Sequence, residues 1–166
     1  SPKQIIQSVT YPGGTDLYLR LDCLTSYKNK IYWAKYTGSS DLTNVFAPTN
    51  AGTYSVYYFV GTPDNPEGGT RVDGQTRIDK ALPKSDNFTF TAPSSLNYDG
   101  TAKTATVTIK DGVIGMGEVT VRYYSDEDRY NEVAECKNPG TYYVGIDVDN
   151  GENYNSDERV YDWYDD

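Results

Sequence analysis

Carboxylate and amide side chains crowd one short stretch near the end of the chain. Within eleven residues they include Asp147, Asp149, Asn150, Glu152, Asn153 and Asp157. Ca²⁺ prefers hard oxygen ligands of this kind, which makes Asp147, Asp149, Glu152 and Asp157 the candidate metal ligands. The stretch lacks the Asp-x-Asp-x-Asp-Gly spacing of an EF-hand loop, and a solvated hairpin turn explains its composition without a metal. We favour the turn, and expect no cofactor.

Catalytic chemistry is hard to assemble from the remaining residues. A nucleophile needs a base, and the chain contains no histidine. Its two cysteines, Cys23 and Cys136, lie in different halves of the chain, so buried free thiols are expected rather than a disulfide. Gly112, Gly115 and Gly117 lack the strand–turn–helix context of a phosphate loop. We therefore predict that the chain is not an enzyme; a β-rich hydrolase using paired carboxylates is the alternative.

The charge of the chain restricts its partners. Its 166 residues carry a formal net charge of −9. Nucleic acid is excluded as a partner because phosphate binding needs clustered Lys and Arg, and the same charge disfavours anionic membranes. No apolar run approaches the ~20 residues of a membrane span, so we expect no membrane insertion. No signal peptide opens the chain at Ser1, which indicates a fragment of a longer protein.

Alternation of apolar and polar residues predicts the elements that position these groups. Seventeen tyrosines, together with many Thr and Val, favour strands. Strict alternation over 142–148 predicts a half-buried strand, and 104–109, 119–123 and 17–23 follow the same pattern, the last placing Cys23 on an inward face. No segment has the pattern of an amphipathic helix. The chain is therefore expected to be all-β.

The chain also repeats itself. Asn-Ala-Gly-Thr-Tyr-Ser-Val at 50–56 returns 88 residues later as Asn-Pro-Gly-Thr-Tyr-Tyr-Val at 138–144, and Tyr-Pro-Gly-Gly at 11–14 returns 87 residues on as Tyr-Asp-Gly-Thr. Two landmarks kept in order at nearly one spacing indicate a tandem duplication. Residues 79–86 lack alternation and contain a proline. We predict two modules, 1–81 and 86–166, joined by a short semi-rigid linker at 82–85.

The repeated Gly-Thr-Tyr has a mechanical interpretation. Glycine permits the turn that ends a loop, and Tyr54 or Tyr142 then begins a strand. This is the layout of a tyrosine corner, in which the hydroxyl bonds back to upstream backbone and fixes the corner of a β-sandwich. We favour this structural role over a ligand contact.

Both modules resemble one family. The segments that carry the resemblance are 96–103 (LNYDGTAK), 115–121 (GMGEVTV), 138–142 (NPGTY) and 151–154 (GENY) in the second module, and 11–14 (YPGG), 47–54 (APTNAGTY) and 78–81 (IDKA) in the first. Together they resemble the MBG-type repeats, Ig-like modules of bacterial secreted and cell-surface proteins, adhesin-like ones included. The first module departs by lacking Gly-Met-Gly and Gly-Glu-Asn-Tyr. The resemblance implies two tandem Ig-like antiparallel β-sandwiches, an extracellular or cell-surface location and no catalytic residues.

Position-by-position comparison of the modules gives one candidate contact surface. With Tyr36 aligned to Tyr123 and Tyr54 to Tyr142, the outward face of the first module is expected to carry an aromatic strip, defined as Ile31, Trp33, Tyr57 and Phe59. The twin positions in the second module are polar. An exposed apolar strip usually marks a contact surface. Three explanations remain open: burial under the 37–50 loop, cover by the other module or a protein partner, or stacking on sugar rings.

These inferences favour one function. We predict a non-catalytic module of a bacterial surface or secreted protein that serves as a spacer and display repeat, with adhesion to a protein or glycan at the cell surface. A carbohydrate-binding module with its site on the aromatic strip is the alternative, and a self-associating stalk is a third. A monomer is expected rather than an oligomer.

Overall fold

The computed structural model describes residues 7–14, 31–35, 48–62 and 65–161. The chain divides into two compact units, unit 1 (Ser1–Ala81) and unit 2 (Leu82–Asp166), with the boundary beside the expected linker at 82–85. The described residues form strands and one 3₁₀ turn, η2 (Ser85–Asn87), and contain no α-helix. None of the helical structure in this part of the chain has the length and apolarity needed to span a membrane. The prediction of an all-β chain is confirmed.

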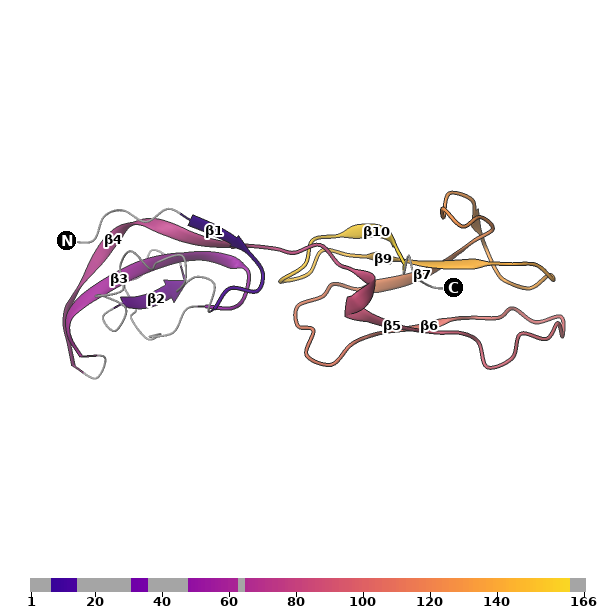
Figure 1. The fold of residues 1–166 in the computed structure, drawn as a ribbon, viewed down its shortest axis with the longest axis horizontal. Coiled ribbons are helices and arrows are strands. Elements are labelled where there is room, and N and C mark those ends of the chain that lie inside the picture. Colours follow the sequence, from indigo (N-terminus) through magenta and orange to yellow (C-terminus); the bar gives the residue numbers. More distant parts are fainter. Residues whose placement is uncertain (1–6, 15–30, 36–47, 63–64, 162–166) are drawn as a thin grey trace. The chain divides into compact units, whose positions relative to one another are not determined.

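Unit 1 is built on one four-stranded sheet. Its strands are β1 (Gln7–Thr10), β2 (Ile31–Lys35), β3 (Gly52–Thr62) and β4 (Asn65–Asp79), in the order β1-β4-β3-β2. β1 runs parallel to β4, and the other pairs are antiparallel. The β3–β4 register shifts twice, between Ser55 and Val56 and between Phe59 and Gly61. Such irregularities bend a strand, and both long strands curve visibly (Figure 1).

The two sequence landmarks of the first repeat meet at one end of this sheet. Gly13 donates its N–H to the Thr49 carbonyl at 3.0 Å, and Gly14 donates to the Pro48 carbonyl at 2.7 Å. A Cβ at Gly13 would lie 2.3 Å from Cδ1 of buried Ile78. Only glycine allows this approach at position 13, and the second repeat also has a glycine, Gly100, at the corresponding position.

Unit 2 contains two antiparallel sheets. β5 (Phe88–Thr91) pairs with β6 (Thr106–Ile109), and the larger sheet has the order β10-β9-β7-β8. Its strands are β7 (Val119–Tyr124), β8 (Glu132–Val133), β9 (Tyr143–Val148) and β10 (Asp157–Val160). Three of the predicted strands are therefore confirmed, as β6, β7 and β9; the one predicted over 17–23 lies outside the described residues.

Both sheets of unit 2 contribute to one apolar core. Phe88 of β5 packs with Ile146 and Val148 of β9 and Val160 of β10, all buried. Partly buried Phe90, Val107, Met116, Val119 and Val121 surround this cluster. Burying a side chain of this size stabilises by about 1.5–3 kcal/mol, so the alternation of β9 contributes directly to stability.

The Gly-Met-Gly and Gly-Glu-Asn-Tyr segments of unit 2 pack on each other. A Cβ at Gly117 would lie 1.9 Å from the Asp149 carbonyl oxygen, and one at Gly151 would lie 2.4 Å from the Gly115 carbonyl oxygen. Fully buried Asn153 donates its backbone N–H to Gly115 at 3.0 Å and its side-chain amide to Ile114 at 3.2 Å. Glycines are therefore required where two backbones touch, and Asn153 is a structural residue of this contact.

The same tyrosine hydrogen bond occurs in both units. The Tyr54 hydroxyl donates to the Asn50 carbonyl at 2.8 Å, and the Tyr142 hydroxyl donates to the Asn138 carbonyl at 2.6 Å. Each bond ties a tyrosine at a strand start to the backbone four residues earlier, which confirms the predicted corner geometry.

Removing this bond should measurably destabilise unit 2. In Tyr142→Phe the Asn138 carbonyl loses its donor, and we expect a cost of about 0.5–1.5 kcal/mol, the usual net value of one hydrogen bond. Urea unfolding followed by circular dichroism measures it. Tyr98→Phe, at a mostly exposed tyrosine, is the matched control, and equal effects of the two substitutions would contradict a stabilising role for the corner.

Candidate functional site

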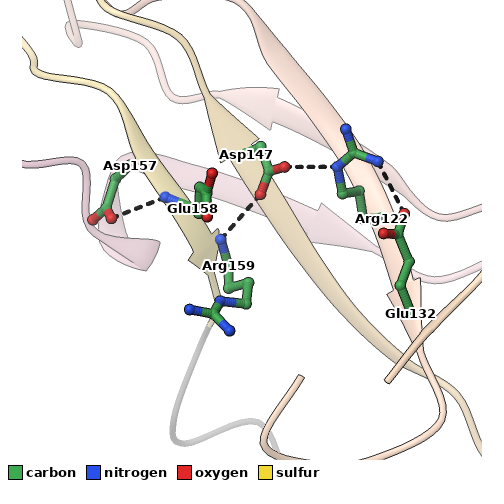
Figure 2. Close-up of polar contacts among 6 residues, drawn as sticks. All are labelled: Arg122, Glu132, Asp147, Asp157, Glu158 and Arg159. Carbon is green, nitrogen blue, oxygen red and sulfur yellow. Dashed lines mark hydrogen bonds and ion pairs between the residues drawn. The ribbon is translucent and has the colours of Figure 1, made fainter. Parts of the chain in front are cut away.

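The outer face of the larger sheet of unit 2 carries a network of charged side chains (Figure 2). Arg122 of β7 donates from Nε to Asp147 of β9 at 2.6 Å and from its terminal nitrogen to Glu132 of β8 at 2.9 Å. The second carboxylate oxygen of Asp147 accepts the backbone N–H of Arg159 at 3.1 Å. Glu132, followed by Asp147, raises the pKa of the Arg122 guanidinium. Because Arg122 is partly exposed, water screens these pairs and they add little stability.

This network engages one of the candidate calcium ligands. Both oxygens of Asp147 already accept hydrogen bonds, and Asp157 accepts the N–H of its neighbour Glu158 at 2.9 Å. Asp149 and Glu152 are exposed on the hairpin that packs against Gly115–Gly117. Within the described ranges, no group of three or more His, Cys, Asp or Glu side chains is placed to hold a metal ion. In this hairpin the carboxylate of Asp147 binds Arg122 instead.

A buried arginine lies beside this network. Arg129 is only 6% exposed, with its guanidinium carbon 3.8 Å from the ring centre of Tyr161 and 5.3 Å from that of Tyr143. Its Nε donates to the Val144 carbonyl at 3.1 Å and its terminal nitrogen to the Glu127 carbonyl at 2.5 Å. The positive charge is thus stabilised by aromatic faces and carbonyl oxygens rather than by a carboxylate.

The loop that carries Arg129 is fixed by Asp126. Its carboxylate accepts the N–H of Asn131 at 2.7 Å and that of Tyr130 at 3.0 Å. These donors, that of Asn131 first, lower the pKa of the Asp126 carboxyl. The sequence pattern predicted no amphipathic helix in this loop and no role for Arg129. The only sequence signal for a buried arginine was the presence of Tyr143 and Tyr161, whose rings contact Arg129 in the structure. The sequence does not show that these rings approach Arg129, because their contact depends on the fold.

The strands that carry the aromatic strip of unit 1 pair with each other. β2 and β3 are antiparallel neighbours in which Trp33 lies opposite Val56, and Tyr32 lies opposite Tyr57. That Ile31, Trp33, Tyr57 and Phe59 share one face stays a prediction. Their side chains lie outside the described part of the structure, and a contact role for any of them stays a prediction.

Cys136, the cysteine among the described residues, does not make a nucleophilic site. Cys136 is a buried free thiol, as expected, and burial raises the pKa of its thiol. A raised pKa keeps the sulfur protonated and unreactive. Cys23 lies outside the described residues.

A cavity of about 650 Å³ lies in unit 2 at the start of β9. Its mostly apolar lining includes Leu96, Tyr98, Tyr123, Cys136, Tyr142 and Val144. The Tyr123 hydroxyl accepts the Ala105 N–H at 2.7 Å and so fixes one wall. Leu96 and Tyr98, which also line the cavity, are 77% and 65% exposed.

Comparison of the chain with protein-family models, curated proteins and solved structures finds no match in any of the three. The assignment of function therefore depends on the residues and contacts described above.

Truncating the buried arginine should destabilise unit 2. Arg129→Ala removes two hydrogen bonds from a charged donor and its stacking on Tyr161 and Tyr143, and we expect a loss of about 2–4 kcal/mol. Urea unfolding gives the value. Arg159→Ala, an exposed arginine 5.5 Å from the Tyr130 ring, should cost well under half as much. Similar losses in both variants would contradict the role of burial.

Asp126 should make unit 2 sensitive to acid. Its folded pKa lies below the unfolded value of about 3.9, so the unfolded state takes up protons first as pH falls. The stability that Asp126 contributes is complete above pH ~4 and is lost as pH falls through the folded pKa. Urea midpoints between about pH 2 and 6 should fall less steeply in Asp126→Asn than in the wild type. Asp128→Asn on the same loop is the control; identical slopes for all three chains would rule out this linkage.

Proposed function

We propose that this chain is a pair of Ig-like repeats from a bacterial surface or secreted protein, and that it acts without catalysis as a spacer and display module in adhesion. The observation that carries the proposal is the repeated corner. The Tyr54–Asn50 and Tyr142–Asn138 hydrogen bonds join a tyrosine to the carbonyl four residues earlier in each unit. An extended array of repeats requires that each repeat keep the contacts that hold its fold together, such as this tyrosine corner, rather than a reactive site.

The chemistry of unit 2 favours the same function. Its polar clusters are internally satisfied: Arg122 binds two carboxylates, Arg129 binds carbonyl oxygens and rings, and Asp126 binds backbone N–H groups. Catalytic groups are instead held with a reactive atom aimed at an open site. A chain without histidine, whose described thiol is buried, fits a role based on rigidity and surface contact.

A surface glycan or a surface protein is the proposed partner. The net charge of −9 keeps such a chain apart from nucleic acid and anionic lipid. The edge strand β2 pairs only with β3 among the described residues, and it carries Trp33. Tryptophan is a common anchor of binding surfaces, which makes β2 the place to test first.

The test is a fluorescence titration of Trp163→Phe, in which Trp33 is the remaining tryptophan, against panels of glycans and matrix proteins. We expect a saturable change in Trp33 emission for a surface partner, lost affinity in Trp33→Ala, and no cleavage of any glycan. Release of reducing ends would overturn the non-catalytic assignment. Binding to no member of either panel would overturn adhesion and leave a spacer, and concentration-dependent mass in sedimentation would instead indicate a self-associating stalk.

A further inference from the structure

The hairpin between β9 and β10 carries a dipeptide with a chemistry of its own. Asn150-Gly151 is the only Asn-Gly pair in the sequence. In such a pair the main-chain nitrogen of glycine can attack the side-chain carbonyl carbon of asparagine, because glycine has no Cβ to obstruct the approach. Asn150 is exposed, so water reaches its side-chain amide. The dipeptide therefore has the groups needed for spontaneous deamidation.

This reaction needs only the chain and water. The Gly151 nitrogen loses its proton and bonds to Cγ of Asn150, the bond from Cγ to Nδ2 breaks, and ammonia leaves with the proton. Water then opens the cyclic imide at either of its carbonyl carbons, which gives aspartate or isoaspartate. In isoaspartate the main chain runs through the side-chain carbons and is longer by an atom. No electrons are transferred, so no oxidant or reductant is required.

The fold holds the attacking nitrogen in place. Gly151 donates its N–H to the carbonyl oxygen of buried Tyr154 at 2.8 Å. Gly151 also packs on another backbone segment, since a Cβ there would lie 2.4 Å from the Gly115 carbonyl oxygen and 2.5 Å from the Gly117 nitrogen. The proton that must leave is thus held in a hydrogen bond, and the glycine has no room to turn toward the Asn150 side chain. Ring closure requires the hairpin to open.

We propose that Asn150-Gly151 is a deamidation site that the folded hairpin keeps unreactive, and that it is converted when the hairpin opens. Folded proteins open locally at a lower cost than global unfolding, so the stability of this hairpin sets the rate of conversion. The inference does not depend on the adhesive role proposed above.

Conversion should prevent the hairpin from closing again. A Cβ on Gly117 would lie 1.9 Å from the Asp149 carbonyl oxygen, so the longer main chain of isoaspartate has no space at this contact. The new carboxylate also stands close in sequence to Asp149 and Glu152, two exposed acids, and like charges repel. Each conversion therefore leaves a permanent change in unit 2, and converted chains accumulate with time.

The corresponding hairpin of unit 1, between β3 and β4, has its asparagine before a proline. Asn65 lies opposite Thr62 and is followed by Pro66. A proline nitrogen has no proton to lose, so it cannot form the imide by this route. Of the two hairpins, we expect conversion only in that of unit 2.

Peptide mapping of the full chain by mass spectrometry measures the conversion. The protein is kept at mildly alkaline pH, folded or in urea, and the aspartate and isoaspartate formed at Asn150 are quantified over time. We expect conversion at least ~10-fold slower in the folded chain, because only the open fraction of hairpins reacts. Asn97 is the internal control, since it is exposed but precedes Tyr98, whose Cβ obstructs the attack in both conditions. No conversion of Asn150 in urea, or equal rates in both conditions, overturns the proposal.

Two substitutions test whether the hairpin controls the rate. Asn153→Ala removes the side-chain hydrogen bond to the Ile114 carbonyl and should raise the rate in buffer at least ~3-fold, because the hairpin opens more easily. Asn155→Ala, at an exposed asparagine nearby, should leave the rate unchanged. Equal rates in the two variants would contradict control by the hairpin, and the wild-type comparison remains decisive if Asn153→Ala does not fold. Converted chains, separated by ion exchange, should unfold at lower urea than unconverted ones; equal midpoints would show that the hairpin closes again.

Discussion

The alternation of β9 between two chemically different faces is the constraint on which unit 2 depends. On the inner face, Ile146 and Val148 pack with Phe88 across the two sheets. On the outer face, Asp147 binds Arg122 and Tyr143 lies under Arg129. A shift of one residue would exchange these faces, burying a carboxylate in the apolar core and exposing Ile146 to water, so the register of β7 against β9 is strongly fixed. Only Gly145 between them lacks a side chain, and a Cβ there would lie 3.2 Å from the Tyr124 ring. The packing of the outer face therefore leaves little room for a side chain at that position.

Strand positions and the tyrosine corner were predictable because both are local. Apolar and polar residues alternate along 104–109, 119–123 and 142–148, and a corner needs only a tyrosine and a carbonyl four residues before it.

The register between paired strands is not local, because it depends on how two distant segments align. The sequence carries no direct signal for whether Trp33 opposes Val56 or Tyr57, whereas the pairing of β2 with β3 places it opposite Val56. Arg129 was missed for a related reason: its partners Tyr143 and Tyr161 lie far along the chain, and an arginine in a polar loop is usually solvated.

The acidic hairpin illustrates why composition alone does not identify a metal site. The carboxylate and amide side chains of residues 147–157 satisfy the preference of Ca²⁺ for hard ligands, but ligands must also converge. In a hairpin, neighbouring side chains alternate between faces, and here Asp147 is drawn to Arg122 on the outer face while Asn153 turns inward to Ile114. Close backbone contact between Gly117 and Asp149 fixes this division. Enough acidic and amide residues are present for a metal site, but the strand geometry places their side chains apart.

The two repeats preserve a joint while differing in what surrounds it. Each keeps the hydroxyl–carbonyl bond of its corner tyrosine, but unit 1 packs Gly13 against Ile78, whereas unit 2 packs Gly117 against Asp149. Duplicated modules diverge most easily where packing can be rebuilt from other residues, and least where one short bond fixes the entry of a strand into the sheet. Surfaces flanking the corner are therefore free to acquire different partners.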